Sequence, residues 1–288
     1  MRHTFLGAGA IGGLLAAALA RAGVPTVVLL RPAALARYPG RVTVESAVLG
    51  NFEIDVPATS ALADEADILW IATKATELEQ ALVLVPPERV REGMTVIPLL
   101  NGVDHVAALR ARYPKVVAGA IRVESERLPP AHIRQSSPFL RVELAGAEAA
   151  AVDLRAAGIE CRVRDDELSL LWEKLAFLAP IALGTTALDA PLGAVREDDR
   201  YKGCQLDAFA IARAEGAHID EDALCALAAA APYEMRSSMQ KDVAGGRQPE
   251  LDAIAGPILR GSGRHGIATP STEELSRLVD ARATRRVG

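Results

Sequence analysis

Glycine spacing gives the first chemical signal in this chain, because Gly7, Gly9 and Gly12 form a G-x-G-x-x-G motif. An apolar run precedes the motif and an alanine-rich, helix-like segment follows it, which is the order of a dinucleotide-binding turn. Gly7 permits the tight turn, Gly9 leaves room for a pyrophosphate, and Gly12 lets helix and strand pack closely. The helix start at Ala10 and Ile11 offers N–H groups and a partial positive charge to phosphates. The motif therefore predicts a dinucleotide cofactor, against the alternative of a plain glycine-rich turn.

Two cations bear on the type of dinucleotide. Arg31 stands at the end of the apolar run 27–30, where NAD-binding proteins usually carry an acid that binds the ribose hydroxyls. An arginine at this place suits a 2′-phosphate instead, so NADP is favoured over NAD. Lys74 lies just beyond another apolar run, in the region where open α/β sheets bind their ligands. Each cation can also be an ordinary solvated side chain at the end of a strand or the start of a helix.

Polar residues in apolar surroundings indicate a second candidate site. Lys174 is a single lysine in the largely apolar helical stretch 168–183. A desolvated lysine has a lowered pKa and is suited to proton transfer, although Lys174 can also reach water or pair with Glu173. Asn101 belongs to an Asn-Gly pair that places an amide near the nicotinamide ribose or the substrate, or simply forms a turn. Glu250 begins a predicted helix and gains a function only if it has a partner such as Lys174.

The elements that position these residues can be predicted from the hydrophobic pattern. The first half alternates apolar runs with helical or turn-rich segments, which is typical of parallel β-α-β units. The predicted parallel strands are residues 3–6, 26–31, 68–73 and 95–99. An antiparallel hairpin is predicted at 42–44 and 52–56, and strand-like runs at 116–121, 139–144 and 161–163 are expected to finish the sheet. His132 lies among these strand-like residues and could act as an acid, although a lone histidine is more often structural or exposed.

The second half of the chain has a different character. After residue 166 the β-branched runs give way to long helical patterns, which belong in a core or a domain interface where they are apolar. Helices are predicted at 168–183, 200–215, 220–231, 233–244, 250–260 and 271–284. The sequence therefore predicts an α/β dinucleotide-binding domain over residues 1–165 and a helical domain over residues 166–288.

Composition narrows the functional class. The chain has 288 residues, half of them hydrophobic, and a formal net charge of −5, which argues against a nucleic-acid surface. Apolar runs are interrupted by charges or helix breakers before they reach the length of a membrane span, and no signal peptide is expected. The three cysteines have no metal-type spacing. We therefore expect a cytoplasmic protein that binds no metal, nucleic acid or membrane.

In the order and spacing of these motifs the chain resembles the ketopantoate reductases over nearly its whole length. The matching segments are the glycine motif, Arg31, Lys74, Asn101-Gly102, Trp172-x-Lys174-Leu175, Ser237-Ser238-Met239-x-x-Asp242 and Glu250-x-Asp252. The resemblance implies a Rossmann-type doubly wound parallel sheet, followed by an all-helical domain like that of 6-phosphogluconate dehydrogenase relatives, with the active site in the cleft between them. It also implies that the helical domain holds the substrate and can form a homodimer.

The resemblance further implies NADPH-dependent reduction of 2-dehydropantoate to pantoate, in the pathway to pantothenate and coenzyme A. Carried over by position, Lys174 is the general acid that protonates the carbonyl oxygen. Glu250 completes the catalytic pair and, with Ser238, holds the polar groups of the substrate. Asn101 places the lysine, the substrate or the cofactor. The cations at positions 31 and 74 meet the adenosine 2′-phosphate.

One departure from the family pattern falls in the predicted substrate site. The family carries asparagines four and eight residues after its lysine, where this chain has Leu178 and Ala182. The only asparagines of the chain are Asn51 and Asn101, so none in the second half can replace them. Apolar replacements give up the discrimination that buried hydrogen-bonding groups provide. Two alternatives to ketopantoate reduction remain: a related reductase of a bulkier or more apolar ketone, and a non-catalytic NADP-binding sensor.

Overall fold

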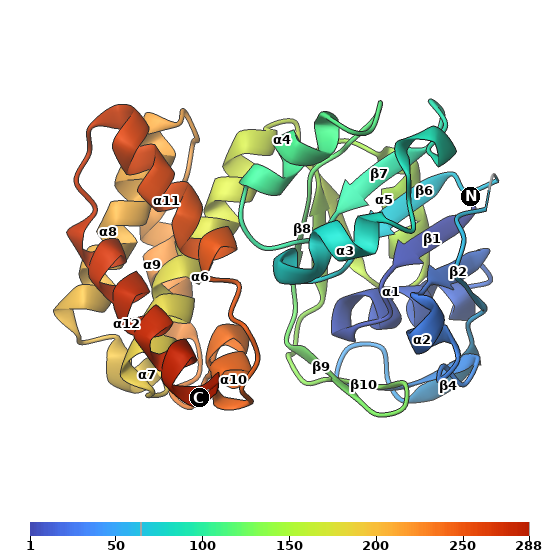
Figure 1. Cartoon of the computed structure of the whole chain (residues 1–288), viewed down its shortest axis with the longest axis horizontal. Coiled ribbons are helices and arrows are strands. Elements are labelled where there is room, and N and C mark those ends of the chain that lie inside the picture. Colours follow the sequence, from blue (N-terminus) through green and yellow to red (C-terminus); the bar gives the residue numbers. More distant parts are fainter. Residues whose placement is uncertain (64, 288) are drawn as a thin grey trace. The chain divides into compact units, whose positions relative to one another are not determined.

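The computed structural model describes residues 1–63 and 65–287 and divides the chain into two compact units (Figure 1). Unit 1 comprises Met1–Leu100 and His105–Glu167, and unit 2 comprises Asn101–Asp104 and Leu168–Gly288. The predicted boundary at residue 165 lies two residues before the observed one. The short segment Asn101–Asp104 groups with the helical residues although it follows a strand of unit 1, and local sequence patterns did not predict this.

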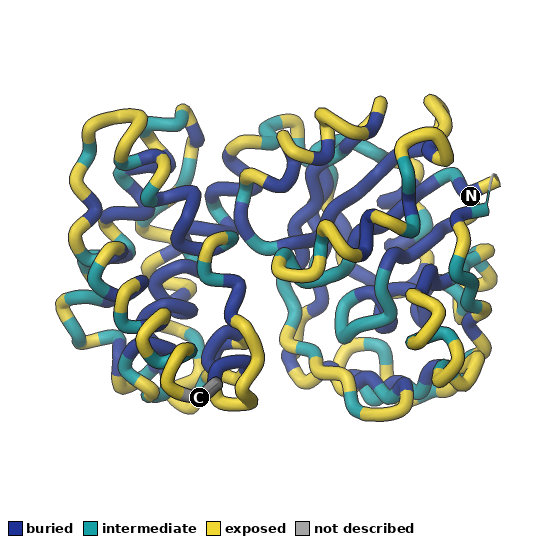
Figure 2. The backbone as a smooth tube through the Cα atoms, in the orientation of Figure 1, coloured by how far each residue is buried: buried dark blue, intermediate teal, exposed yellow. Residues whose placement is uncertain are grey.

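A five-stranded, all-parallel sheet with the strand order β5-β2-β1-β6-β7 forms the centre of unit 1. Its strands are β1 (His3–Leu6), β2 (Thr26–Leu29), β5 (Ala58–Thr59), β6 (Ile68–Ile71) and β7 (Thr95–Pro98). The four predicted parallel strands are thereby confirmed, and the two-residue β5 is an addition at the edge. Strands β1, β6 and β7 are buried along their whole length (Figure 2), as expected of strands covered on both faces.

The remaining strands of unit 1 form two further sheets. One has the order β4-β3-β10-β9 and contains the predicted hairpin, whose strands pair antiparallel. The other has the order β12-β11-β8. Their bounds are β3 (Arg41–Ser46), β4 (Phe52–Asp55), β8 (Gly119–Arg122), β9 (Ser125–Leu128), β10 (His132–Gln135), β11 (Arg141–Leu144) and β12 (Glu160–Val163). The expectation that the segment 116–163 finishes the parallel sheet is therefore wrong, since its connection to β7 is an isolated bridge between Val96 and Val116.

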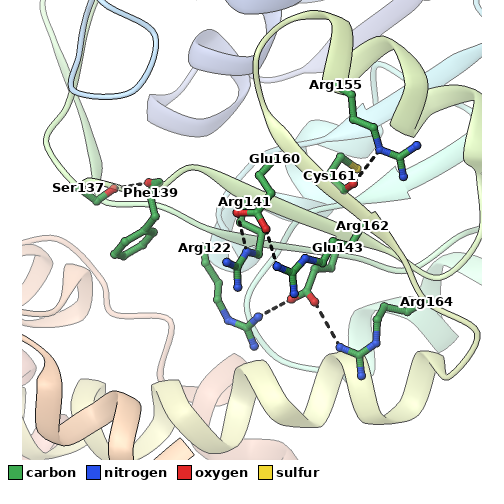
Figure 3. A network of polar contacts seen from close by, with 10 residues as sticks. All are labelled: Arg122, Ser137, Phe139, Arg141, Glu143, Arg155, Glu160, Cys161, Arg162 and Arg164. Carbon is green, nitrogen blue, oxygen red and sulfur yellow. Dashed lines mark hydrogen bonds and ion pairs between the residues drawn. The ribbon is translucent and has the colours of Figure 1, made fainter. Parts of the chain in front are cut away.

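Side-chain alternation explains why β8, β11 and β12 make a sheet of their own. In β11, Val142 and Leu144 belong to the hydrophobic core, whereas Arg141 and Glu143 lie on the opposite face. Glu143 accepts hydrogen bonds from Arg122 and, at 3.2 Å, from Arg164 (Figure 3). A strand that continues a doubly wound sheet is apolar on both faces, whereas this pattern of one apolar and one charged face is typical of a mixed or antiparallel sheet.

The helices of unit 1 are short apart from α1, which fills its core. Eight consecutive residues of α1, Gly12 to Leu19, are buried, and its alanines and leucines join the main hydrophobic cluster. The helices are α1 (Ala10–Arg21), α2 (Pro32–Leu35), α3 (Leu78–Leu82), α4 (Asp104–Arg110) and α5 (Glu148–Ala156), with 3₁₀ turns η1 (Ala75–Glu77) and η2 (Pro87–Arg89). The small side chains of α1 allow it to lie close to the strands that it covers.

A buried histidine is fixed at the start of β1. Trp70 Nε1 donates to His3 Nδ1 at 2.9 Å, so the other ring nitrogen of His3 carries the proton and donates to Asp153 at 2.9 Å. Burial lowers the pKa of His3 below its usual 6.5, although the hydrogen bond to Asp153 opposes this shift. A protonated His3 would point a second N–H at the N–H of Trp70. The structure therefore keeps His3 neutral.

We expect unit 1 to lose stability as the pH falls below about 6.5, the pKa of His3 in the unfolded chain. In that range the imidazole of His3 is protonated in the unfolded state but stays neutral in the folded state. The free energy of unfolding therefore falls by at most about 1.4 kcal/mol per pH unit for this one group. Urea unfolding of the wild type and His3→Gln at about pH 7.5 and about pH 5.5 measures the effect. The variant should show a smaller loss between the two values, whereas His265→Gln, which removes an exposed histidine paired with Glu215, should behave like wild type. An equal loss in wild type and His3→Gln would contradict the assignment.

Unit 2 is helical, as predicted. Its helices are α6 (Glu167–Leu188), α7 (Leu192–Val195), α8 (Asp199–Ala214), α9 (Glu221–Ala230), α10 (Ser238–Ala244), α11 (Leu251–His265) and α12 (Pro270–Val287). Helix α6 is long and apolar enough to cross a membrane by length and composition, but 78% of its apolar window is buried within the protein. It is the core helix around which the hydrophobic cluster of this unit forms. The predicted helix 233–244 is shortened because Ser237 caps α10 and the residues before it form a turn.

Candidate active site

The glycine motif has the geometry that its spacing predicts. Gly7 has φ +99°, which favours glycine, and its N–H donates to the Leu29 carbonyl at 3.2 Å. A β-carbon on Gly12 would lie 2.0 Å from the carbonyl oxygen of Gly7, so only glycine fits there. At Gly9, by contrast, no atom of the described residues lies within 4 Å of an added β-carbon. Gly9 therefore borders open space, and the turn fits a group that approaches its backbone closely.

Helix α1 begins directly after this open position. Gly9 is the residue before the helix, and the first turn consists of Ala10, Ile11 and Gly12, which bring no acid to its positive end. The first N–H groups of a helix lack partners within the helix, and together with the helix dipole they bind anions. The turn and the helix start thus form a cradle that suits a dinucleotide pyrophosphate.

Arg31 and Lys74 lie at the carboxyl ends of two strands that flank β1. Arg31 precedes α2 and is about half exposed; its Nη1 donates to Gln80 at 3.3 Å and its Nη2 lies 3.9 Å from a carboxylate oxygen of Glu77. Lys74 is half-buried and precedes η1 after β6. Both cations belong to unit 1, as does the glycine cradle. Their positions are compatible with an adenosine 2′-phosphate.

A second group of predicted residues comes together in unit 2. The side-chain amide of Asn101 donates to Glu250 Oε2 at 3.0 Å, although 149 positions separate the two residues. The neighbouring Gly102 has φ +86°, and an added β-carbon would lie 2.2 Å from the carbonyl oxygen of Ala253. The Asn-Gly turn is therefore seated against the first turn of α11. This contact gives Glu250, the residue that precedes α11, a partner that spacing alone could not reveal.

Lys174 is placed in the buried part of helix α6, with 9% of its surface exposed. A lysine that extends fully into bulk solvent would be far more exposed, so most of this side chain is covered by other residues. Leu178, one turn further along, is half-buried and packs against the hydrophobic cluster of unit 2, and Ala182 is a buried member of that cluster. The replacements for the family asparagines are thus stabilised by apolar contacts.

Ser238 differs from the other predicted substrate residues because it is exposed at the start of α10. Its neighbour Ser237 is buried; its hydroxyl accepts from the N–H of Gln240 at 3.1 Å and lies 2.8 Å from Thr185 Oγ1. Ser237 therefore connects α10 to α6, a role that the prediction missed. A serine before a helix is a common capping signal, which could have distinguished Ser237 from Ser238.

The remaining sequence predictions concern His132 and metal-binding side chains. His132 lies in β10, and its Nε2 is 3.1 Å from a carboxylate oxygen of Glu45 in β3. Across residues 1–63 and 65–287, no group of three or more His, Cys, Asp or Glu side chains could hold a metal ion. Lys174, Asn101 and Glu250 remain the candidate residues for chemistry in unit 2, and the glycine cradle of unit 1 remains the candidate cofactor site.

A parallel sheet with a glycine cradle at its first strand is typical of dinucleotide-binding proteins, and comparison with known proteins specifies the family. Residues 4–145 match the family profile described as Ketopantoate reductase PanE/ApbA, and residues 167–283 match that of its C-terminal region. The chain is 31% identical over 296 residues to a 2-dehydropantoate 2-reductase of Mycobacterium tuberculosis (strain ATCC 25618 / H37Rv), with 96% of both chains covered. It belongs to the ketopantoate reductase family, whose members are NADP-dependent oxidoreductases.

Solved structures agree with the fold of this family. The crystal structure of a PanE/ApbA family ketopantoate reductase from Ralstonia eutropha JMP134 has a TM-score of 0.88 at 26% identity, with 100% of both chains covered. A ternary structure of D-mandelate dehydrogenase with NADH and anilino(oxo)acetate has a TM-score of 0.87 at 22% identity, with 99% of both chains covered, which shows a likeness of fold alone. The predicted Rossmann-type sheet with a helical C-terminal domain is confirmed.

Proposed function

We propose that this protein reduces 2-dehydropantoate to pantoate with NADPH, a step in the supply of pantothenate and coenzyme A. The observation that carries the proposal is the hydrogen bond between Asn101 and Glu250, in the unit that also contains the buried Lys174. A carbonyl reduction needs a positioned proton donor and groups that orient the substrate, and these residue types supply them. Family membership supports the same reaction.

Within this proposal, Lys174 transfers a proton to the substrate's carbonyl oxygen. Bound NADPH supplies hydride to the carbonyl carbon, so negative charge develops on the oxygen as the C–H bond forms. A cationic donor held in a buried position stabilises that charge and then gives up its proton, which it regains from solvent. Glu250, oriented by the amide of Asn101, accepts a hydrogen bond from the hydroxyl group of the substrate, and the exposed hydroxyl of Ser238 is available for its other polar groups.

The residues of unit 1 hold the cofactor in this proposal. The cradle at Gly7, Gly9 and Gly12 receives the pyrophosphate, with the N–H groups of Ala10 and Ile11 directed toward it. Open space at Gly9 supports this role, because no atom of the described residues lies within 4 Å of an added β-carbon there. The arginine and lysine described above bind the 2′-phosphate, which distinguishes NADP from NAD.

A second candidate function is the reduction of a more apolar 2-oxo acid or ketone. Leu178 and Ala182 support this alternative, because neither side chain can form a hydrogen bond with a substrate hydroxyl. Both are stabilised by packing within unit 2. The D-mandelate dehydrogenase fold shows that the architecture alone does not choose between the two substrates. A binding protein without turnover is the remaining alternative, and it gives no reason for a buried lysine in the helical unit.

The test measures NADPH oxidation with 2-dehydropantoate, with 3-methyl-2-oxobutanoate, which lacks the hydroxymethyl group, and with phenylglyoxylate. The proposal expects the highest kcat/KM with 2-dehydropantoate. A higher value for one of the other substrates would favour the second candidate function. Tight NADPH binding without turnover of any of the three compounds would contradict both enzyme hypotheses and favour a sensor.

The proposed enzyme function also bears on the cellular location and the oligomeric state of the protein. We infer a cytoplasmic enzyme that acts on small molecules and forms a homodimer through its helical unit. Exposed apolar side chains in that unit support an interface, with 65% of Leu206 and 58% of Tyr233 accessible. Sedimentation analysis of the intact chain distinguishes a monomer from a dimer.

A further inference from the structure

Arg31 has an acidic neighbour at the place proposed for the 2′-phosphate. Its guanidinium lies 3.9 Å from the Glu77 carboxylate and donates to the Gln80 side chain at 3.3 Å. Glu77 belongs to η1, which directly follows Lys74, so the acid lies three residues after the second of the two cations. Both partners of the ion pair are about half exposed, with 54% and 55% of the two side chains accessible.

This neighbour has a direct electrostatic consequence for ligand binding. A 2′-phosphate that binds the Arg31 guanidinium must come within a few ångströms of the Glu77 carboxylate, because that carboxylate already contacts the same group. The phosphate carries up to two negative charges, so it is repelled by Glu77 and must compete with it for the arginine. A nucleotide that has a free 2′-hydroxyl in place of the phosphate meets no such repulsion.

We propose that Glu77 is a specificity-determining residue that limits the affinity of this chain for nucleotides carrying a 2′-phosphate. The inference rests on the proposed role of Arg31 in binding that phosphate. Removing the negative charge frees Arg31 and ends the repulsion while leaving the pyrophosphate cradle unchanged. The residue therefore narrows the difference in affinity between NADPH and NADH.

The experiment compares wild type, Glu77→Gln and Arg31→Ala by calorimetric titration. The ligands are NADPH, NADH, adenosine 2′,5′-bisphosphate and adenosine 5′-monophosphate, so binding is measured without turnover. Glu77→Gln should tighten the binding of NADPH and of the bisphosphate about three- to tenfold, the size expected for one screened charge at an exposed site. NADH and the monophosphate should bind as to wild type. The gain should shrink in high salt, because the interaction is exposed.

Glu79→Gln is the matched control. It removes the same charge two residues further along, where Glu79 pairs with Arg112 at 2.8 Å, and should leave all four affinities unchanged. If Glu77→Gln leaves NADPH affinity unchanged or weakens it while Arg31→Ala weakens it, the inference fails and the proposed role of Arg31 stands. If Arg31→Ala leaves the NADPH affinity unchanged, the proposed role of Arg31 fails and the inference fails with it. An equal gain for NADPH and NADH would also overturn the inference.

Discussion

Replacing Lys174 with alanine is expected to lower kcat for 2-dehydropantoate about 10²–10⁴-fold, the usual contribution of a positioned general acid. Without the lysine, the developing negative charge on the carbonyl oxygen loses its cationic neighbour, and the proton must come from water. NADPH affinity should change little, because the residues proposed to bind it belong to unit 1. Steady-state kinetics, together with titration of NADPH fluorescence on binding, separates the two effects.

A matched lysine in the same unit serves as the control for this loss. Lys202 is half exposed and pairs with Glu197 at 2.8 Å, so Lys202→Ala should keep wild-type kcat. Because Lys174 is buried, circular dichroism must first show that Lys174→Ala retains the helical content of the wild type. A folded Lys174→Ala protein whose kcat stays within about twofold of wild type would remove the lysine from the mechanism, since a twofold change is far below the contribution of a general acid.

Alanine substitutions at Gly9 and Gly12 should separate cofactor binding from folding. Gly9 has φ −73°, which alanine adopts without strain, and its β-carbon position is open among the described residues. Gly9→Ala should therefore keep its thermal stability but lose NADPH affinity about tenfold or more, the effect of roughly 1.4 kcal/mol of lost contact. Gly12→Ala forces a β-carbon to within 2.0 Å of the Gly7 carbonyl oxygen. It should be destabilised by about 1–3 kcal/mol, as for other overpacked sites.

Thermal unfolding and calorimetric NADPH titration of both variants check this pair. The discriminating result is the contrast: one variant loses affinity at wild-type stability, and the other loses stability. If Gly9→Ala bound NADPH as tightly as wild type, the pyrophosphate would have to lie elsewhere. If Gly12→Ala were as stable as wild type, the turn would have to relax in a way that the structure does not indicate.

Much of the fold could be predicted from local sequence patterns. The four parallel strands, the hairpin and most helices of unit 2 could be predicted, because hydrophobic periodicity and turn residues act over short stretches of chain. The sheet to which a strand belongs depends on partners far along the sequence, which is why β8, β11 and β12 were wrongly assigned to the parallel sheet. The arginine and glutamate residues of β11 were a usable sign, since they mark a strand with one charged face.

The candidate site was predictable to a similar extent. The glycine cradle is a local motif, so its residue types and spacing determined its geometry. The pairing of Asn101 with Glu250 spans 149 positions and was not predicted. The predicted partner of Glu250 was Lys174, because spacing alone does not show which distant residues meet. The contact of Ser237 with Thr185 could not be predicted, because it joins α10 to α6 across 52 positions. The substrate role of Ser238, which was carried over by position, stays a prediction.

The grouping of Asn101–Asp104 with the helical residues restricts how the chain can be recombined with its relatives. A chimera joined near residue 167 would pair the helical residues of one protein with the Asn-Gly turn of another. The two residues that contact the start of α11 would then come from the wrong parent. They are Gly102, which has no side chain and so fits against Ala253, and Asn101, the partner of Glu250. An exchange that preserves these contacts has to move two separate segments, Asn101–Asp104 and Leu168–Gly288, as one inherited block.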